Sequence, residues 1–256
     1  MYAWIPFQQD FLDELLRHEE FSTETLRPWC ATCSCLPELF RCESCGEFSE
    51  CQECCLVRHQ CSPLHCISRW NGEFWENTTL EKLGLTFQLG HAGGECPIPG
   101  AGQHLTVLHM NGVHSVQVSW CGCNVSGGDA RWQQLMHNGW YPVMTAEPQT
   151  CSTFECLDTF RLLNVITNVN VHDYVSTLEQ KMDAWGMEWV PDRYKGFGRM
   201  SRQWACLMRL KRVGVGHLKD GISSVVEGSV AVPYWACPRE GMNLPVGSRD
   251  LPAEVQ

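Results

Sequence analysis

The chain has 256 residues and a formal net charge of -10, and 44% of its residues are hydrophobic against 19% that are charged. This composition, with 11 Trp and 10 Phe, excludes an extended disordered chain, because enough apolar surface is present to form a core. The acidic balance also argues against a protein that coats nucleic acid with its whole surface.

Residues 1–29 are predicted to form an N-terminal helix. The segment Met1–Asp10 has neither a basic n-region nor an apolar h-region, so we expect no secretory signal. No apolar run reaches the roughly 18 residues that would predict a membrane-spanning helix, so we expect no transmembrane segment and no membrane partner.

Seventeen cysteines are the most informative feature of the composition, and ten of them lie between Cys30 and Cys66. Since no export signal is expected, this density favours metal binding over disulfide bonds, although a disulfide cluster is the alternative. A module of this size buries too little surface to fold without such cross-links. We therefore predict a metal-binding module over residues 30–78.

Three Cys-x2-Cys pairs and two histidines form a regular pattern within this module. A Cys-x2-Cys pair suits zinc because its short knuckle brings both thiolates to about 2.3 Å from one tetrahedral ion. Short loops allow the first and third pairs to share one ion while the second pair and the histidines hold another. The first cluster is then Cys30, Cys33, Cys51 and Cys54, and the second cluster is Cys42, Cys45, His59 and His65.

Eight ligands complete two four-ligand zinc sites, so both are predicted to be structural. Cys35 or Cys55 is an alternative to a neighbouring cysteine in this scheme. The spacing resembles the B-box zinc module, a cross-braced relative of the RING finger.

Residues 105–120 predict a β-hairpin, because Asn111-Gly112 joins two β-rich runs and a type I′ turn requires positive φ at both positions. A loop at these two residues places His109 opposite His114. Such a cross-strand histidine pair is more often packing or surface than a ligand. The predicted buried face consists of Leu105, Val107, Val116 and Val118.

A third zinc site is predicted at the open end of this hairpin, within a β-rich domain over residues 79–150. Its ligands would be His91, Cys96, Cys121 and Cys123 (the third cluster). His109 and His114 lie by the turn, about 23 Å from Cys121, which is too far to join it. Reduced or buried cysteines beside an uninvolved histidine are the alternative.

The pattern becomes helical over residues 151–215, with apolar residues at three- and four-residue steps. Three helices are predicted, over residues 154–166, 172–183 and 197–213, and their apolar stripes are interpreted as a helical core. Residues 216–256 are predicted to be a linker.

The window from Arg193 to Lys219 contains eight basic residues and no acidic one. This basic stripe predicts either a phosphate-binding face or a surface against which the acidic N-terminal helix of the same chain packs (an internal dock). The residues expected to contact nucleic acid are Arg199, Arg202, Arg209, Lys211 and Arg212. The acidic residues of the alternative dock are Asp10, Asp13, Glu14, Glu19 and Glu20.

No nucleotide-binding, hydrolase, metalloprotease or kinase signature occurs in the sequence. The chain also lacks the carboxylates at strand ends that a two-metal nuclease needs. We therefore expect no enzymatic activity and no small-molecule cofactor.

Several short strings, in this order along the chain, resemble the N-terminal region of fungal Kyakuja–Dileera–Zisupton (KDZ) transposases, which carries a CxC-type cysteine cluster. These strings are Phe11-Leu-Asp-Glu-Leu-Leu16, the cysteine cluster, Leu64-His65, Trp70-Asn-Gly72, Leu83-Gly84-Leu85, Gln88-Leu-Gly-His91, Asn111-Gly-Val-His114, Cys121-Gly-Cys123, Trp140-Tyr-Pro142, Pro191-Asp-Arg-Tyr194, Leu210-Lys-Arg212, Gly216-His217, Ala236-Cys-Pro238 and Gly241-Met-Asn-Leu-Pro245.

The resemblance implies a zinc-chelating region ahead of a DDE-type transposase domain with an RNase H-like fold. The family's catalytic carboxylates lie beyond the equivalent of Asn243-Leu-Pro245, so we expect this chain to lack the catalytic domain and to keep a recognition part. One departure is the single Cys237 where a further Cys-x2-Cys pair is expected. The resemblance also implies a nuclear location and binding to DNA at transposon ends.

These observations predict an α+β chain. Small zinc-stabilised modules, a B-box-like cross-brace and a β-hairpin-based cysteine-cluster domain, are followed by a helical C-terminal part. Two zinc ions are expected, and a third at the third cluster. The alternative function is a B-box-like protein interaction module that binds protein partners or self-associates.

Overall fold

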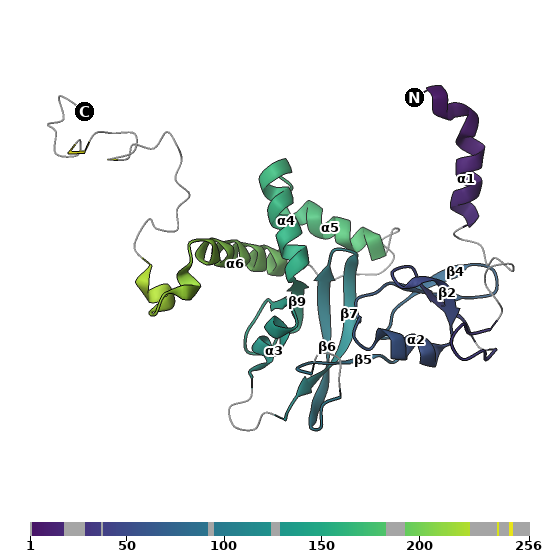
Figure 1. Ribbon diagram of the computed structural model, residues 1–256, viewed down its shortest axis with the longest axis horizontal. Coiled ribbons are helices and arrows are strands. Elements are labelled where there is room, and N and C mark those ends of the chain that lie inside the picture. Colours follow the sequence, from purple (N-terminus) through teal and green to yellow (C-terminus); the bar gives the residue numbers. More distant parts are fainter. Residues whose placement is uncertain are drawn as a thin grey trace. The chain divides into compact units, whose positions relative to one another are not determined.

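The computed structural model describes residues 2–17, 29–36, 38–91, 95–123, 129–182, 193–225, 240 and 246–247 (Figure 1). The chain divides into two compact units, 1–202 and 203–256, and the boundary falls within helix α6 (Tyr194–Arg212). Small sheets, cysteine clusters and a helical C-terminal part confirm the predicted α+β class. In the described part of the chain, no helix has the length and apolar character needed to cross a membrane.

The N-terminal helix is formed by a 3-10 turn, Tyr2–Phe7, and α1, Gln8–Arg17. All described side chains of α1 are exposed, including the apolar residues Phe11, Leu12 and Leu15. Glu19 and Glu20 lie outside the described residues, as do Cys237, Gly241–Pro245 and most of the predicted linker.

The first sheet is an antiparallel four-stranded sheet with the order β2-β1-β3-β4. Its strands are β1 (Phe40–Cys42), β2 (Gly46–Glu50), β3 (Ile67–Trp70) and β4 (Trp75–Thr78), and α2 (Gln52–His59) follows β2. The strands are only three to five residues long, and their core joins Phe40 and Ile67 to Leu80, Leu83 and Leu85. A core this small leaves much of the module's stability to cross-links.

The second sheet has five strands in the order β5-β7-β6-β9-β8. These strands are β5 (Thr86–Gln88), β6 (Pro99–His109), β7 (Gly112–Cys121), β8 (Trp140–Pro142) and β9 (Thr150–Thr153). The β6–β7 hairpin is its centre, and β5 and β9 run parallel to the hairpin strands that they pair with. The predicted buried face of the hairpin is confirmed, because Leu105, Val107, Val116 and Val118 are at most 3% exposed.

The predicted register of the hairpin is wrong by two residues. The turn consists of Met110 and Asn111, so His109 pairs with Gly112 and Val107 pairs with His114. Of the two predicted turn residues only Gly112 has a positive φ, at 151°. A shift of two residues preserves which side chains share a face, which is why the predicted face survives the wrong register.

The C-terminal helices match the predicted ranges closely, as α4 (Phe154–Thr167), α5 (Val171–Met182) and α6. A short helix, α3 (Arg131–His137), precedes β8. The helical core contains a set of three rings, Phe160, Tyr174 and Phe197, whose centroids lie 5.1 to 5.5 Å apart. The predicted helix over residues 197–213 begins earlier, at Tyr194, because Arg193 to Phe197 already forms a helical turn with a backbone hydrogen bond of 2.9 Å.

Candidate metal centres

The first cluster joins a turn ahead of β1 to the start of α2. Cys30 and Cys33 come from the turn, Cys51 immediately precedes α2, and Cys54 lies in its first turn. The four sulfur atoms lie within 4.8 Å of one another, and the Sγ atoms of Cys33 and Cys51 are 3.7 Å apart. Tetrahedral zinc with bonds of about 2.3 Å would place its sulfur ligands about 3.8 Å apart. The structure therefore brings the four predicted residues to the spacing of one metal ion.

Backbone geometry around the first cluster favours thiolates. The Cys33 N–H points at Cys30 Sγ and the Cys54 N–H at Cys51 Sγ, each at 3.5 Å, and Cys51 is the N-cap of α2. Burial opposes ionisation of Cys30, but backbone N–H groups, first that of Cys33, lower its pKa to about 6. Hydrogen bonding to Cys51 and burial raise the pKa of Cys54 instead. The pKa of Cys33 is lowered as well, first by its hydrogen bond with Cys35. The cluster thus favours thiolates at Cys30 and Cys33 and needs a cation to hold four.

Cys35, an alternative ligand in the sequence analysis, lies against the first cluster. Its Sγ is 2.9 Å from Cys33 Sγ. Ser34, between them, has a φ of 59°, which turns both side chains to the same side. Cys35 does not belong to the set of four whose ligand atoms are mutually within 4.8 Å.

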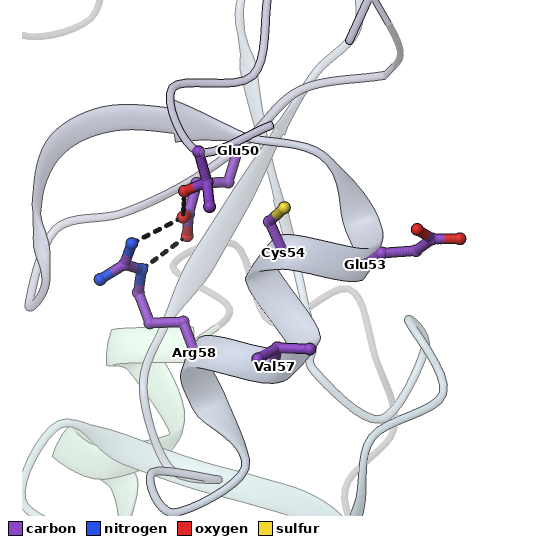
Figure 2. Close-up of a pocket in the computed structure, with 6 residues that line it drawn as sticks. Glu50, Glu53, Cys54, Val57 and Arg58 are labelled. Carbon is purple, nitrogen blue, oxygen red and sulfur yellow. Dashed lines mark hydrogen bonds and ion pairs between the residues drawn. The ribbon is translucent and has the colours of Figure 1, made fainter. Parts of the chain in front are cut away.

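A groove beside the first cluster is lined by Thr32, Glu50, Glu53, Cys54, Val57 and Arg58 (Figure 2). Arg58 and Glu50 point toward each other and form two hydrogen bonds of 2.7 Å, whereas Glu53 points away. Thr32 donates a further hydrogen bond to Glu50. Burial would raise the pKa of Glu50, but the hydrogen bonds from Arg58 and Thr32 and the charge of Arg58 hold it below its usual value. This contact ties the turn that carries Cys33 to the helix that carries Cys54.

The second cluster lies at the opposite end of α2. Cys42 ends β1, Cys45 follows in the turn to β2, His59 ends α2, and His65 lies in the next loop. Cys45 Sγ is 3.4 Å from His59 Nε2 and 3.3 Å from His65 Nδ1. All four ligand atoms are mutually within 4.8 Å, so the predicted set is brought together.

The two histidines face the second cluster with different nitrogens. His59 presents Nε2, because its Nδ1–H donates to the Cys55 carbonyl at 2.7 Å. His65 presents Nδ1, and burial lowers its pKa, which keeps the ring neutral and able to bind a metal. The hydrogen bond from His59 Nδ1–H to the Cys55 carbonyl fixes the His59 ring in the tautomer that leaves Nε2 free to bind a metal. Cys55, the other alternative ligand, therefore orients His59 through its backbone.

The third cluster lies at the open end of the β6–β7 hairpin. His91 follows β5, Cys96 precedes β6, Cys121 ends β7 and Cys123 follows it. His91 Nε2 is 3.2 Å from Cys121 Sγ and 3.3 Å from Cys123 Sγ, and Cys96 Sγ is 3.7 Å from Cys121 Sγ. Burial opposes ionisation of Cys96, but backbone N–H groups lower its pKa to about 7, and hydrogen bonding to Cys121 raises that of Cys123 to about 11. The structure brings together all four predicted residues.

Two residues that shape the third cluster were not predicted. Gly90 has a φ of 86°, and a Cβ at this position would lie 2.7 Å from the Cβ of Cys121, so only glycine fits. Gln134 of α3 accepts from the Cys121 N–H at 2.9 Å and donates to its carbonyl at 3.1 Å. The glycine directly before His91 was a usable signal, whereas no local pattern marks Gln134, since its role depends on the packing of α3 against β7.

His109 and His114 belong to none of these clusters, in agreement with the distance expected from the strand geometry. His109 Nδ1 lies 2.9 Å from Thr153 Oγ1, and His114 Nε2 lies 2.6 Å from Asn111 Oδ1.

The basic residues of the predicted nucleic-acid interface lie on α6 and are exposed: Arg199, Arg202, Arg209, Lys211 and Arg212. Arg193 differs from them, because its side chain is 17% exposed and lies 4.0 Å from Glu179. The exposed basic stripe therefore begins within the helix.

Each cluster supplies four ligands and leaves no position for a reacting water, which is the arrangement of a structural metal site. Residues 80–186 match a family model described as "CxC2 like cysteine cluster associated with KDZ transposases". This match covers the third cluster and the second sheet, whereas the first and second clusters precede it. The comparisons with curated proteins and with solved structures give no match. The chain thus carries, at residues 80–186, the CxC-type cysteine-cluster region that is associated with KDZ transposases.

Proposed function

We propose that this chain is a zinc-binding accessory region of a KDZ-type mobile element that contributes to DNA recognition. The observation that carries the proposal is the presence of three complete four-ligand clusters, one of them inside the matched CxC2 region. Their ligand sets, four cysteines, two cysteines with two histidines, and three cysteines with one histidine, are those that structural zinc prefers. Zinc also supplies the positive charge that several adjacent thiolates require.

Metal analysis of the full chain, purified without chelator, tests the zinc sites. We expect about three zinc ions per chain, one for each cluster. Cys51→Ala should remove one ion, and the double change Cys121→Ser/Cys123→Ser should remove another. Cys61→Ala is the control, because Cys61 is exposed and lies outside the clusters. A zinc content below about one per chain, or an equal loss in the control, would contradict the proposal.

The exposed basic residues of α6 support contact with the phosphate backbone. No base-reading motif accompanies them, so we propose sequence-independent contacts. Three or four phosphate contacts would give a log–log salt slope of about -3 to -4 on duplex DNA. Because the chain carries a net charge of -10, it must overcome its own repulsion of DNA, and binding should weaken steeply with salt.

Replacing Arg199, Arg202 and Arg209 with Gln tests the DNA contact. The variant should bind duplex DNA more weakly, with a salt slope shallower by about two to three units and little change in sequence preference. The matched control replaces Arg69, Lys82 and Arg161, which changes the net charge equally but lies outside α6. Unchanged binding together with a lower melting temperature would instead assign the basic stripe to docking of the acidic N-terminal helix.

We also propose that the chain has no nuclease or strand-transfer activity of its own. The proposal rests on clusters whose four ligands leave no open position and, within the part of the chain that the structure describes, on the lack of a carboxylate set at strand ends. The test incubates the pure chain with DNA and Mg²⁺ or Mn²⁺. Cleavage that an Asp→Asn change abolishes would overturn it.

A DNA-recognition role further implies a nuclear location, which microscopy of the tagged chain would check.

The second candidate function is protein interaction through the B-box-like module. The ligands of the first two clusters alternate along the chain around α2, which is the cross-braced order that suggested the B-box resemblance. This alternative requires a protein partner or self-association. Concentration-dependent self-association without salt-sensitive DNA binding would favour it.

A further inference from the structure

The turn of the β6–β7 hairpin contacts the loop that carries a ligand of the second cluster. The Asn111 side chain donates from Nδ2 to the backbone carbonyl of Leu64 at 2.8 Å. Leu64 directly precedes His65, whose Nδ1 faces the second cluster. A residue of the CxC2 region thus contacts the peptide group that directly precedes the candidate ligand His65, 47 positions earlier in the sequence.

The orientation of the Asn111 amide is fixed by both of its partners. A carbonyl oxygen only accepts hydrogen bonds, so Nδ2 must face Leu64 and Oδ1 must face the other way. There Oδ1 accepts from His114 Nε2 at 2.6 Å. His114 is 5% exposed, and burial lowers its pKa to about 4, so the ring is neutral near pH 7 and its Nε2–H serves as the donor.

His65 depends on this contact more than the other ligands of the second cluster do. Cys42 lies on a strand and His59 on a helix. Cys45 lies in the tight β1–β2 turn, where its N–H donates to the Cys42 carbonyl at 3.1 Å, whereas His65 lies in a loop between α2 and β3. Its own N–H forms a long backbone hydrogen bond, 3.4 Å, to Ser62. The Leu64 side chain packs against the core of the second sheet, so side chain and backbone of Leu64 are both held by residues beyond the first module.

Turn geometry alone does not explain an asparagine at position 111. Asparagine is favoured in hairpin turns because it tolerates a positive φ. The described non-glycine residues with positive φ are Ser34 and Asn168, and Asn111 is not among them. The hydrogen bonds of its side chain are the feature that another turn residue would lack.

We infer that Asn111 is a positioning residue for the second metal centre, holding His65 through the Leu64 carbonyl. The zinc affinity of the second cluster then depends on the hairpin of the CxC2 region. This inference rests on the proposed zinc function. It makes the two modules interdependent, since the last ligand of the second cluster is placed by the region that contains the third.

Competition of the full chain with a chromogenic zinc chelator measures the affinity of each centre. We expect Asn111→Ala to weaken one of the three centres by about 10- to 100-fold, the effect typical of losing a residue that orients a metal ligand, and to leave the other two unchanged. Asn111→Asp should weaken it further, because a charged carboxylate oxygen that faces the Leu64 carbonyl oxygen adds repulsion to the loss of the hydrogen bond. Asn138→Ala, at an exposed position after α3, is the control.

Cobalt substitution identifies which centre has changed. The three clusters differ in thiolate number, with four, two and three cysteines, so their Co²⁺ absorption bands differ. In Asn111→Ala the change should be confined to the centre with two thiolates. If Asn111→Ala does not fold, His114→Phe provides a milder test, because it removes only the donor to Oδ1 and should weaken the same centre less.

Three outcomes separate the claims. An affinity loss confined to the centre with two thiolates supports the inference. Equal weakening of all three centres, or no weakening of any, overturns it while the zinc function stands. A wild-type second cluster that binds neither Zn²⁺ nor Co²⁺ overturns the proposed function itself.

Discussion

His114 shows how a buried histidine links the stability of the hairpin to pH. The ring is 5% exposed on the buried face of β7, and desolvation lowers its pKa from an ordinary 6.5 to about 4. Between these two values the unfolded chain binds a proton that the folded chain does not. The contribution of His114 to the free energy of unfolding is therefore fully present above about pH 6.5, and it is lost as the pH falls toward 4.

Replacing His114 with Gln tests this linkage, since Gln keeps a donor for Asn111 but does not titrate. The wild type should lose about 3 kcal/mol more unfolding free energy than His114→Gln between pH 7 and pH 4. Urea unfolding of both proteins at several pH values, with equal free zinc, gives the difference between their unfolding free energies at each pH. Protonation of the candidate metal ligands affects both proteins alike and therefore cancels in this difference. Parallel pH profiles of the two proteins would refute the assignment.

The candidate metal ligands are the residues that sequence spacing locates best. A Cys-x2-Cys pair is a local geometric unit, so the grouping of Cys30 with Cys33, or of Cys42 with Cys45, requires no knowledge of the fold. Asn111 and Gln134 act through contacts with residues far away in the sequence. Such roles depend on how elements pack and leave no trace in local spacing.

At the scale of elements, the junction of β9 and α4 couples a strand to a helix through Thr153. This residue is the N-cap of α4, where its Oγ1 accepts from the Cys156 N–H at 3.2 Å. The same hydroxyl lies 2.9 Å from His109 Nδ1 on β6. One buried side chain thus satisfies the start of a helix and a histidine of the hairpin.

Thr153→Ala should lower the unfolding free energy by about 1–3 kcal/mol, because the helix loses its cap and His109 loses a buried partner. Thr177→Ala is the control, since its hydroxyl is exposed and contacts only the Asp173 carbonyl within α5. Chemical denaturation of both variants measures the difference. A cost for Thr153→Ala no larger than that of the control would show that the cap contributes nothing.

The hairpin shows what an element pattern predicts and where it stops. Alternation of apolar residues gives the buried face correctly, because side chains of a strand alternate with a period of two. The same pattern does not distinguish registers that differ by two residues. The observed turn is Met110-Asn111, and neither residue has a positive φ, so the type I′ turn that predicted Asn111-Gly112 does not form and Gly112 pairs with His109.

At the scale of the whole molecule, the candidate metal clusters lie in the two sheets, and the helices that follow contribute no residue to them. The first sheet has short strands and two clusters, whereas the helical core of Phe160, Tyr174 and Phe197 contains no cluster residue. A large aromatic core retains its burial energy when metal is lost, and a small cross-linked module does not.

Removal of zinc with a strong chelator should therefore unfold the chain in parts. Hydrogen exchange should show loss of protection over residues 40–78, while residues 154–182 stay protected and most of the helical circular dichroism persists. Re-addition of zinc should restore protection in the first region. Uniform loss of protection along the chain would mean that the helical core also depends on the metals.

The alternation of ligands around α2 has a consequence for synthesis. Cys30, Cys33, Cys42 and Cys45 leave the ribosome before either cluster has its full set of ligands. Because a domain begins to fold from its N-terminus as it emerges, an ion captured early would be held by two thiols from each cluster. The native arrangement then requires an exchange of ligands when Cys51 and Cys54 appear. His65 is held in place only after Asn111 has been made, so the second centre matures well after the first, although its own first ligand, Cys42, precedes the last two ligands of the first.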